Sequence, residues 1–220
     1  AYNEEKRIKQ TLNSINNILG NEISILVVSN GSKDKTVEIL KEWKKDNKNF
    51  NFLEFREKLG KGGAILEGLR RTKSKYVGFI DADDSFDLKT VREIIEKFDD
   101  KDVVIASKWK EKNIFEVDEP FLRKLSSRVW NLMCRILLDL KLNDTQAGAK
   151  FLRKDAFDAI DKEFICKTFS FDVELLFLLN KNGYKIEEKY IKTIHRDGST
   201  FSMKYVFPMF KDLMKLWWSK

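Results

Sequence analysis

The chain has 220 residues, of which 42% are hydrophobic, and this is enough for one domain with a sizeable core. A formal net charge of +7 suits anionic partners such as phosphates, nucleic acid or an acidic membrane face. The single histidine, His195, argues against a histidine-built zinc site, and no apolar run reaches the length of about 18 residues that a membrane span needs. Cys134 and Cys166 lie in apolar stretches, and we expect both to be reduced core residues.

The first half of the chain alternates between helical and strand patterns. Helical spacing of apolar residues covers residues 3–19, 35–45, 60–69 and 88–98. Apolar strand runs cover residues 22–29, 50–55, 76–80 and 103–106. This alternation predicts an α/β fold with a doubly wound, mostly parallel sheet flanked by helices. Asn3 is expected to cap the first helix.

The strand predicted at residues 76–80 ends in a group of acidic residues. Asp81 and Asp83 alternate along the extended chain and so point the same way, with the small Ala82 between them. Open α/β sheets bind ligands at the carboxyl ends of their strands, and carboxylate oxygens suit Mg²⁺ or Mn²⁺ shared with substrate phosphates. The alternative interpretation is a strand end followed by a helix cap formed by Asp84 or Asp87.

A glycine-rich turn, Gly60-Lys61-Gly62-Gly63, opens the third predicted helix. It has neither the phosphate-loop spacing nor the dinucleotide-binding spacing of glycines. The backbone N–H groups of such a turn can still hold an anion. The alternative is that the glycines allow tight packing where the loop enters the helix.

The second half begins with a long helical pattern at residues 121–142. It is apolar around much of its circumference and carries interleaved arginines, which indicates either a buried helix or an amphipathic helix at a membrane interface. A polar turn at 143–148 follows. The remaining predicted elements are a strand at 149–152, a helix at 171–182, an edge strand at 185–190 and a tail helix at 205–218. The tail places tryptophans and lysines beside an apolar face, which suits a headgroup boundary or a helix docked on the body of the domain.

Several of these segments, in this order, resemble the family-2 glycosyltransferases, which have the GT-A fold. The segments that resemble the nucleotide-sugar half of that family are residues 1–5, 28–36, 60–64 and 81–83. Residues 144–151 and 171–176 resemble the branch that makes dolichyl- or polyprenyl-phosphate hexoses. The resemblance implies one catalytic domain, with residues 1–108 as the nucleotide-sugar-binding half and residues 109–220 as the acceptor- and lipid-facing half. Family members begin with an apolar strand, so we expect a first strand ahead of Ala1.

The activity implied by the resemblance is inverting transfer of a hexose from a UDP- or GDP-hexose to a polyprenyl phosphate. The expected location is the cytoplasmic face of a membrane, either peripheral or anchored by a segment outside this sequence, with no nucleic-acid partner. Two departures from the family pattern are Ser29-Asn30, where an acidic pair is usual, and Ser85, where glutamine is common. Two alternatives stay open: an enzyme of the same fold acting on a glycan or protein hydroxyl, and a non-catalytic basic membrane-binding module.

The resemblance also assigns roles to individual residues. Asp83 and Asp81 are expected to hold the Mg²⁺ or Mn²⁺ ion. The expected donor-binding residues are Tyr2, Asn3, Glu4, Asn30, Ser32, Lys61, Gly62, Asp81 and Ala82. The expected acceptor-binding residues are Arg123, Arg128, Gln146, Lys150 and Arg196, and the expected catalytic residues are Asp83, Asp81, Lys108 and Arg128.

A phosphate acceptor affects what the acidic residues of the second half can do. Because a lipid phosphate is already anionic at neutral pH, the reaction needs cations that hold two anions together rather than a general base. Asp172 and Glu174 are therefore expected to have structural roles, capping their helix and orienting Lys150 or Gln146. With a hydroxyl acceptor, one of these two carboxylates would instead serve as general base.

Overall fold

The computed structural model describes residues 1–82, 87–98, 101–113, 115–117, 120–192 and 206–220. The roles predicted for Asp83, Asp84, Ser85 and Arg196 therefore lie outside the described residues.

The described strands form two sheets. In the first, β1 (Ile25–Asn30) pairs in parallel with β2 (Phe50–Phe55). The second contains β3 (Tyr76–Ile80), β5 (Ala149–Arg153), β4 (Val103–Ser107) and β6 (Ile186–Tyr190), in that spatial order. Strand β5 runs antiparallel to both of its neighbours, whereas β4 and β6 are parallel. The predicted α/β class and the edge position of residues 185–190 are confirmed.

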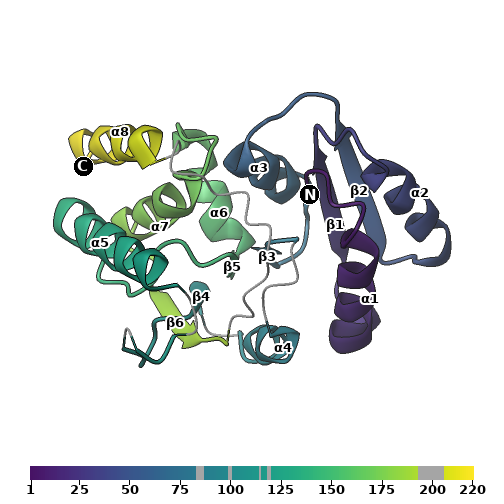
Figure 1. Ribbon diagram of the computed structural model, residues 1–220, viewed down its shortest axis with the longest axis horizontal. Helices are drawn as coiled ribbons and strands as arrows, with labels where there is room; N and C mark the ends of the chain where they lie inside the picture. The colour runs from purple at the N-terminus through teal and green to yellow at the C-terminus, as the bar shows by residue number, and fades with distance from the viewer. Residues whose placement is uncertain (83–86, 99–100, 114, 118–119, 193–205) are drawn as a thin grey trace.

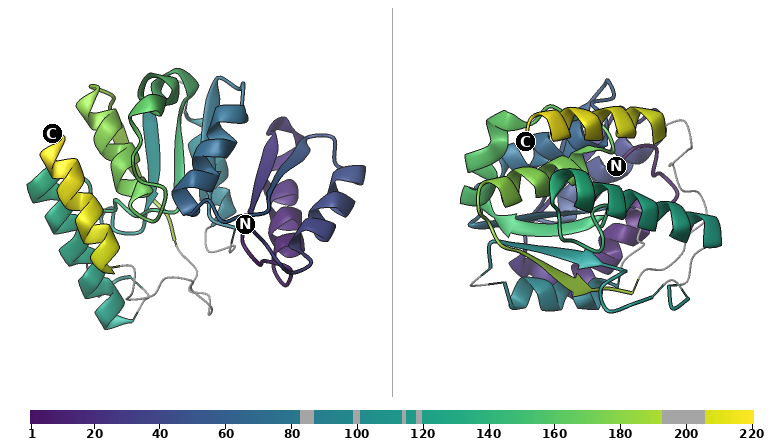
Figure 2. Two further views of the ribbon diagram at one scale, coloured as in Figure 1. Left: turned by 90° about the horizontal axis from the view of Figure 1, so that it is seen from above. Right: turned by 90° about the vertical axis from the view of Figure 1, so that its left-hand side faces the viewer.

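Helices cover both sheets (Figures 1 and 2). Their bounds are α1 Ile8–Leu19, α2 Thr36–Asp46, α3 Lys61–Arg71, α4 Leu88–Glu96, α5 Phe121–Leu138, α6 Lys154–Ile160, α7 Phe171–Lys181 and α8 Val206–Trp218. Short 3₁₀ turns at Gly20–Glu22 and Asp161–Glu163 follow α1 and α6. The sequence pattern did not predict α6, which follows β5 directly.

The prediction that Asn3 caps the first helix is wrong. Helix α1 begins at Ile8, and Asn3 has a φ of 53°, in the left-handed region that asparagine tolerates better than most residues. Its side-chain oxygen instead accepts a hydrogen bond of 2.8 Å from the backbone N–H of Lys33. Asn3 therefore connects the start of the chain to the turn after β1. At α4 the expected cap is confirmed, since the Asp87 carboxylate accepts the N–H of Lys89 at 3.1 Å.

Helix α5 ends at Leu138, four residues earlier than predicted, because Asp139 adopts the left-handed conformation and breaks the helix. The next apolar residues, Leu140 and Leu142, turn into the core instead of extending the helix. One face of α5 is exposed and apolar. Helix α8 lies beside α5 in both views and also has exposed apolar residues (Figure 2). Among the described residues, no helix combines the length and the hydropathy that a bilayer crossing requires.

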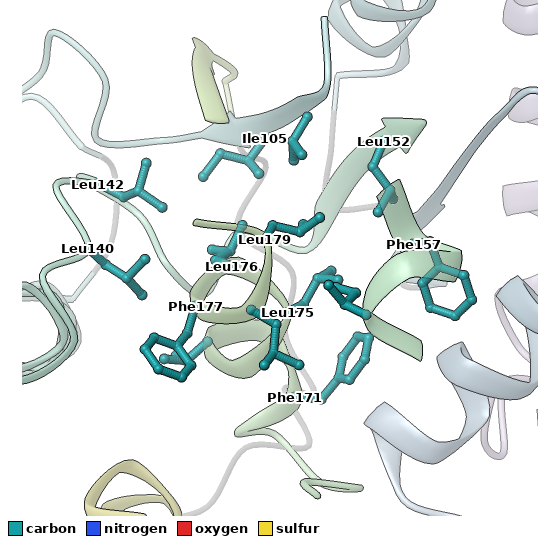
Figure 3. Packing of buried hydrophobic residues seen from close by; sticks show 14 of the residues in the cluster. Ile105, Leu140, Leu142, Leu152, Phe157, Phe171, Leu175, Leu176, Phe177 and Leu179 are labelled. Carbon is teal, nitrogen blue, oxygen red and sulfur yellow. The ribbon is translucent and has the colours of Figure 1, made fainter. Parts of the chain in front are cut away.

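The main core surrounds α7. Every residue from Phe171 to Leu179 is buried, so this helix is enclosed on all sides, as its largely apolar sequence requires. Strand residues such as Ile105 and Leu152 pack against it, together with Phe157 of α6 (Figure 3). Cys134 and Cys166 are free and buried, as expected.

The first residue lies next to the end of β1. The Ala1 amino group donates to the Val28 carbonyl at 2.8 Å, and the Asn30 N–H donates to the Ala1 carbonyl at 2.9 Å. Ala1 and Ala82 pack against the same apolar cluster, and among the described strands β1 and β3 do not pair with each other. The expected strand ahead of Ala1 stays a prediction.

Candidate active site

Four acidic and basic side chains form a continuous chain of ion pairs across the two halves of the molecule. Lys61, at the start of α3, has its ammonium 3.1 Å from one Asp81 oxygen and 3.0 Å from Asp172 Oδ2. The other Asp172 oxygen lies 2.7 Å from Lys150 Nζ, and Lys150 also donates to the Ala147 carbonyl. The order Asp81, Lys61, Asp172, Lys150 runs from the end of β3 to the interior of β5.

These ion pairs differ in burial. Asp172 and Lys150 are fully buried, and 23% of the Lys61 side chain is exposed. Burial alone would raise the pKa of Asp172, but Lys150 and Lys61 outweigh it and hold that pKa below its ordinary value. Burial alone would lower the pKa of Lys61, but Asp172 and Asp81 outweigh it and raise that pKa. Asp172 is therefore ionised at neutral pH and Lys61 is charged.

This arrangement supports the structural role predicted for Asp172. Both of its carboxylate oxygens contact ammonium groups, and its side chain has no exposed surface. It orients Lys150, as predicted, and also Lys61, which the sequence did not indicate. The predicted capping of α7 is wrong, because the oxygens of Asp172 contact ammonium groups and those of Glu174 accept N–H groups that precede the helix. Glu174, two residues further along α7, accepts the N–H groups of Ile165 and Cys166, both at 2.8 Å. Glu174 thus fixes the loop that precedes α7.

The glycine-rich turn packs tightly against the second half. A Cβ atom on Gly62 would lie 2.4 Å from the Phe171 Cβ, and one on Gly60 would lie 2.2 Å from the Lys167 carbonyl oxygen. Gly60 also has a φ of 81°. The Gly63 N–H donates to the Lys167 carbonyl at 3.1 Å. The glycines therefore serve close packing, while Lys61 supplies the charge.

The end of β1 is joined to this turn through Asn30. Its side-chain amide donates to the Gly60 carbonyl at 3.1 Å, and its oxygen accepts the Leu59 N–H at 2.7 Å. Asn30, predicted to be a donor-binding residue, thus holds the backbone of the glycine-rich turn, a role that an aspartate could not fill completely because a carboxylate has no N–H to donate.

The remaining predicted donor residues lie around the same strand end. Lys58 Nζ lies 3.7 Å from the centre of the Tyr2 ring, a cation–π contact. Ser32 accepts the Asn3 N–H at 3.1 Å. Glu4 is buried and pairs with Arg7 at 2.9 Å. The structure therefore brings Tyr2, Asn3, Ser32 and Asn30 together at the carboxyl end of β1. Lys58 also lies there, although no sequence motif indicated it.

A second group of cations gathers around Trp109, just beyond β4. The Arg128 guanidinium lies 4.1 Å from the Trp109 ring centre, and Lys108 Nζ lies 5.7 Å from it. The Lys108 N–H donates to Asp144 at 3.3 Å. The structure thus unites two residues predicted to be catalytic, Lys108 and Arg128. Arg123 lies on the exposed part of α5.

The polar turn at residues 143–148 lies between these groups. Asp144 is buried, and burial raises its pKa above the ordinary value. Gln146 Nε2 is buried and finds no hydrogen-bond partner among the described residues. An unsatisfied buried donor is costly and rare in folded proteins. The acceptor-binding role of Gln146 stays a prediction.

Comparison with solved structures identifies the fold. The structure of a mannosyltransferase from Pyrobaculum calidifontis in complex with GDP-Man and Mn²⁺ matches with a TM-score of 0.62 at 15% sequence identity. The match covers 90% of this chain and 56% of that chain. The fold is that of the GT-A glycosyltransferases, as predicted.

The model of the Glycosyl transferase family 2 matches residues 1–161, and the chain belongs to this family. A dolichyl-phosphate beta-glucosyltransferase from Dictyostelium discoideum is 25% identical over 98% of this chain and 71% of its own length. A UDP-N-acetylglucosamine–dolichyl-phosphate N-acetylglucosaminyltransferase from Methanococcus voltae is 27% identical over 90% of this chain and 85% of its own length.

Proposed function

We propose that the protein transfers a hexose from a nucleoside diphosphate hexose to the phosphate of a polyprenyl lipid. The main support for this proposal is the environment of Asp172. Its two carboxylate oxygens contact Lys61 and Lys150, so they are not available to take a proton from an acceptor hydroxyl. An acceptor that is already an anion needs no such base. The two relatives named above, which act on dolichyl phosphate, support this substrate class.

The proposed reaction breaks one bond at the anomeric carbon and forms another. A phosphate oxygen of the lipid attacks the anomeric carbon, the bond from that carbon to the diphosphate oxygen breaks, and its electron pair stays on the nucleoside diphosphate. Attack from the side opposite the leaving group inverts the anomeric carbon, and no proton has to be transferred. The requirement is positive charge on both sides of the reacting carbon. Lys61 supplies it on the donor side, and Lys108 and Arg128 supply it on the acceptor side.

A divalent cation fits the donor side by the chemistry of its ligands. Asp81 and Asp83 offer only oxygen, which suits Mg²⁺ or Mn²⁺, and such an ion would neutralise charge on the departing diphosphate. No described group of three or more acidic, histidine or cysteine side chains is placed around one metal site. Because Lys61 already contacts Asp81, we assign Asp83 as the principal ligand. Asp81 would position Lys61 and the donor.

The lipid substrate requires a membrane surface, and α5 and α8 provide a candidate. We define the α5–α8 face by its exposed apolar residues, which are Phe121, Leu122, Leu125, Val129, Leu132, Ile136, Val206, Phe207, Phe210, Trp217 and Trp218. Exposed cations, Arg123 and Arg135 on α5 and Lys211 and Lys215 on α8, are interleaved with them. Apolar residues, tryptophans and cations together suit the headgroup boundary of an anionic bilayer.

The function is tested with the protein bound to vesicles that contain polyprenyl phosphate. Labelled UDP- and GDP-hexoses are added with Mn²⁺ or Mg²⁺, with and without a chelator, and the organic phase is counted. Metal-dependent label in the lipid extract is expected. Label on an added oligosaccharide instead would favour the hydroxyl-acceptor alternative, and no transfer from any donor would contradict the proposal.

The membrane surface is tested separately by vesicle flotation. Replacing Leu132 and Ile136, which are 54% and 69% exposed, with serine should move the protein out of the floating fraction. The control is Tyr190→Ser, which removes an exposed aromatic side chain from the edge strand β6 and should leave flotation unchanged. Equal flotation of the double variant and the wild type would show that another surface binds the membrane.

A further inference from the structure

The polar turn at residues 143–146 is held by side chains from two separate elements. From α5, the buried Asn131 accepts the Thr145 N–H at 2.9 Å and the Thr145 hydroxyl at 2.7 Å through one oxygen. Its amide nitrogen donates to the Asn143 carbonyl at 2.8 Å. Asn131 thus bonds both ends of a three-residue stretch, which fixes its backbone path.

From the opposite side, the edge strand β6 supplies Glu188. Its carboxylate accepts the Asn143 N–H at 2.9 and 3.0 Å, the Asn143 side-chain amide at 2.6 Å and the Asp144 N–H at 3.0 Å. The backbone N–H groups of Asn143, Asp144 and Thr145 are therefore all bonded to side chains. A turn can form with backbone hydrogen bonds alone. The additional hydrogen bonds from side chains therefore fix the position of this turn relative to α5 and β6.

The turn delivers groups to the acceptor side of the site. Asp144 accepts the Lys108 N–H at 3.3 Å, and the Ala147 carbonyl accepts the Lys150 ammonium. Gln146, with its unsatisfied buried amide, lies in the same turn. A shift of the turn would therefore disturb the Lys108 backbone, the buried Lys150–Asp172 pair and Gln146 together.

We propose that Asn131 and Glu188 are positioning residues for the acceptor, acting through the turn at residues 143–146. Neither residue belongs to a motif that indicates this role. The inference rests on the proposed function, and it adds that the outer, apolar helix α5 is tied to the acceptor site by Asn131. Functional groups have to be held by rigid neighbours, and misplacement by about 1 Å can lower a rate by about 100-fold.

The test compares Glu188→Gln and Asn131→Asp with a matched control. Glu188→Gln leaves one acceptor oxygen where there were two, and Asn131→Asp loses the donor to the Asn143 carbonyl while keeping its size. The control is Glu187→Gln, which removes the same charge from the adjacent residue of β6, whose partner is Lys101. Measurements are kcat and KM for polyprenyl phosphate, KM for the donor, and the thermal shift caused by UDP and GDP.

We expect both variants to lower kcat/KM for polyprenyl phosphate by about 10- to 100-fold, with donor KM and nucleotide-induced thermal shift unchanged. Glu187→Gln should behave as the wild type. The proposal is overturned if kcat/KM for polyprenyl phosphate is unchanged in both variants. It is also overturned if donor binding is lost together with kcat/KM for polyprenyl phosphate, as a general loss of folding would cause. If the wild type forms no glycolipid, the proposed function has failed; if it does and the variants match it, only the positioning role has failed.

Discussion

Replacing Asp172 with asparagine removes the carboxylate that lies between the ammonium groups of Lys61 and Lys150. Asp172 and Lys150 are fully buried, and Lys61 lies 3.0 Å from the same carboxylate. Removing one partner of a buried ion pair typically costs about 3–5 kcal/mol, because the other charge is left uncompensated. For a chain of this size, each kcal/mol lowers the melting temperature by about 2–4 °C, so a decrease of about 6–20 °C is expected.

The measurement is thermal unfolding followed by circular dichroism or calorimetry, with transfer activity assayed below the transition. Two controls test whether an uncompensated buried charge causes the loss of stability. Adding Lys150→Met to Asp172→Asn removes one of the stranded charges and should recover part of the loss. Glu96→Gln breaks the exposed pair with Arg92 and should leave the melting temperature almost unchanged. An Asp172→Asn protein that melts like the wild type but transfers nothing would refute the structural role and indicate a general base.

Two further predictions concern the packing of α3 and the buried Asp144. Gly62→Ala places a Cβ 2.4 Å from the Phe171 Cβ, so overpacking should lower the free energy of unfolding, measured with urea, by about 1–3 kcal/mol. An unchanged urea midpoint would show that α3 and α7 can move apart. Burial raises the pKa of Asp144 from its ordinary 3.8, so the stability that this group contributes is present below pH 3.8 and is lost as the pH rises through the folded-state pKa. The wild type should therefore lose stability relative to Asp144→Asn as the pH is raised from about 4 to 7; parallel pH profiles of the two proteins would contradict this.

Local chemistry made much of the fold predictable. Residues 50–55 and 76–80 were predicted as strands with the bounds that the structure shows, because turn residues limit each apolar run. Asp87 was recognisable as a cap from its position just before an apolar helical pattern. Helix α6 was missed because only three buried apolar residues mark its seven-residue length, too few for a clear period.

The site was only partly predictable. Lys61, Asp81 and Lys150 could be selected from their motifs. Their connection depends on Asp172, which lies more than 100 positions from the start of α3 and which only the folded chain brings there. Asn3 was misassigned because asparagine suits both a helix cap and the left-handed conformation that it adopts here. The roles of Asn131 and Glu188 had no sequence signal, since asparagine and glutamate are mostly exposed in folded proteins and neither residue stands in a recognisable motif.

In the proposed reaction the nucleophile is an oxygen of the lipid phosphate. Phosphorus-31 NMR of the lipid extract, taken after incubation with polyprenyl phosphate and a nucleoside diphosphate hexose, observes the phosphorus atom that carries this oxygen. We expect the phosphomonoester signal to be replaced by the signal of a phosphodiester, which carries one hexose and resists phosphatase. A phosphomonoester that stays unchanged while nucleoside diphosphate is released would contradict it.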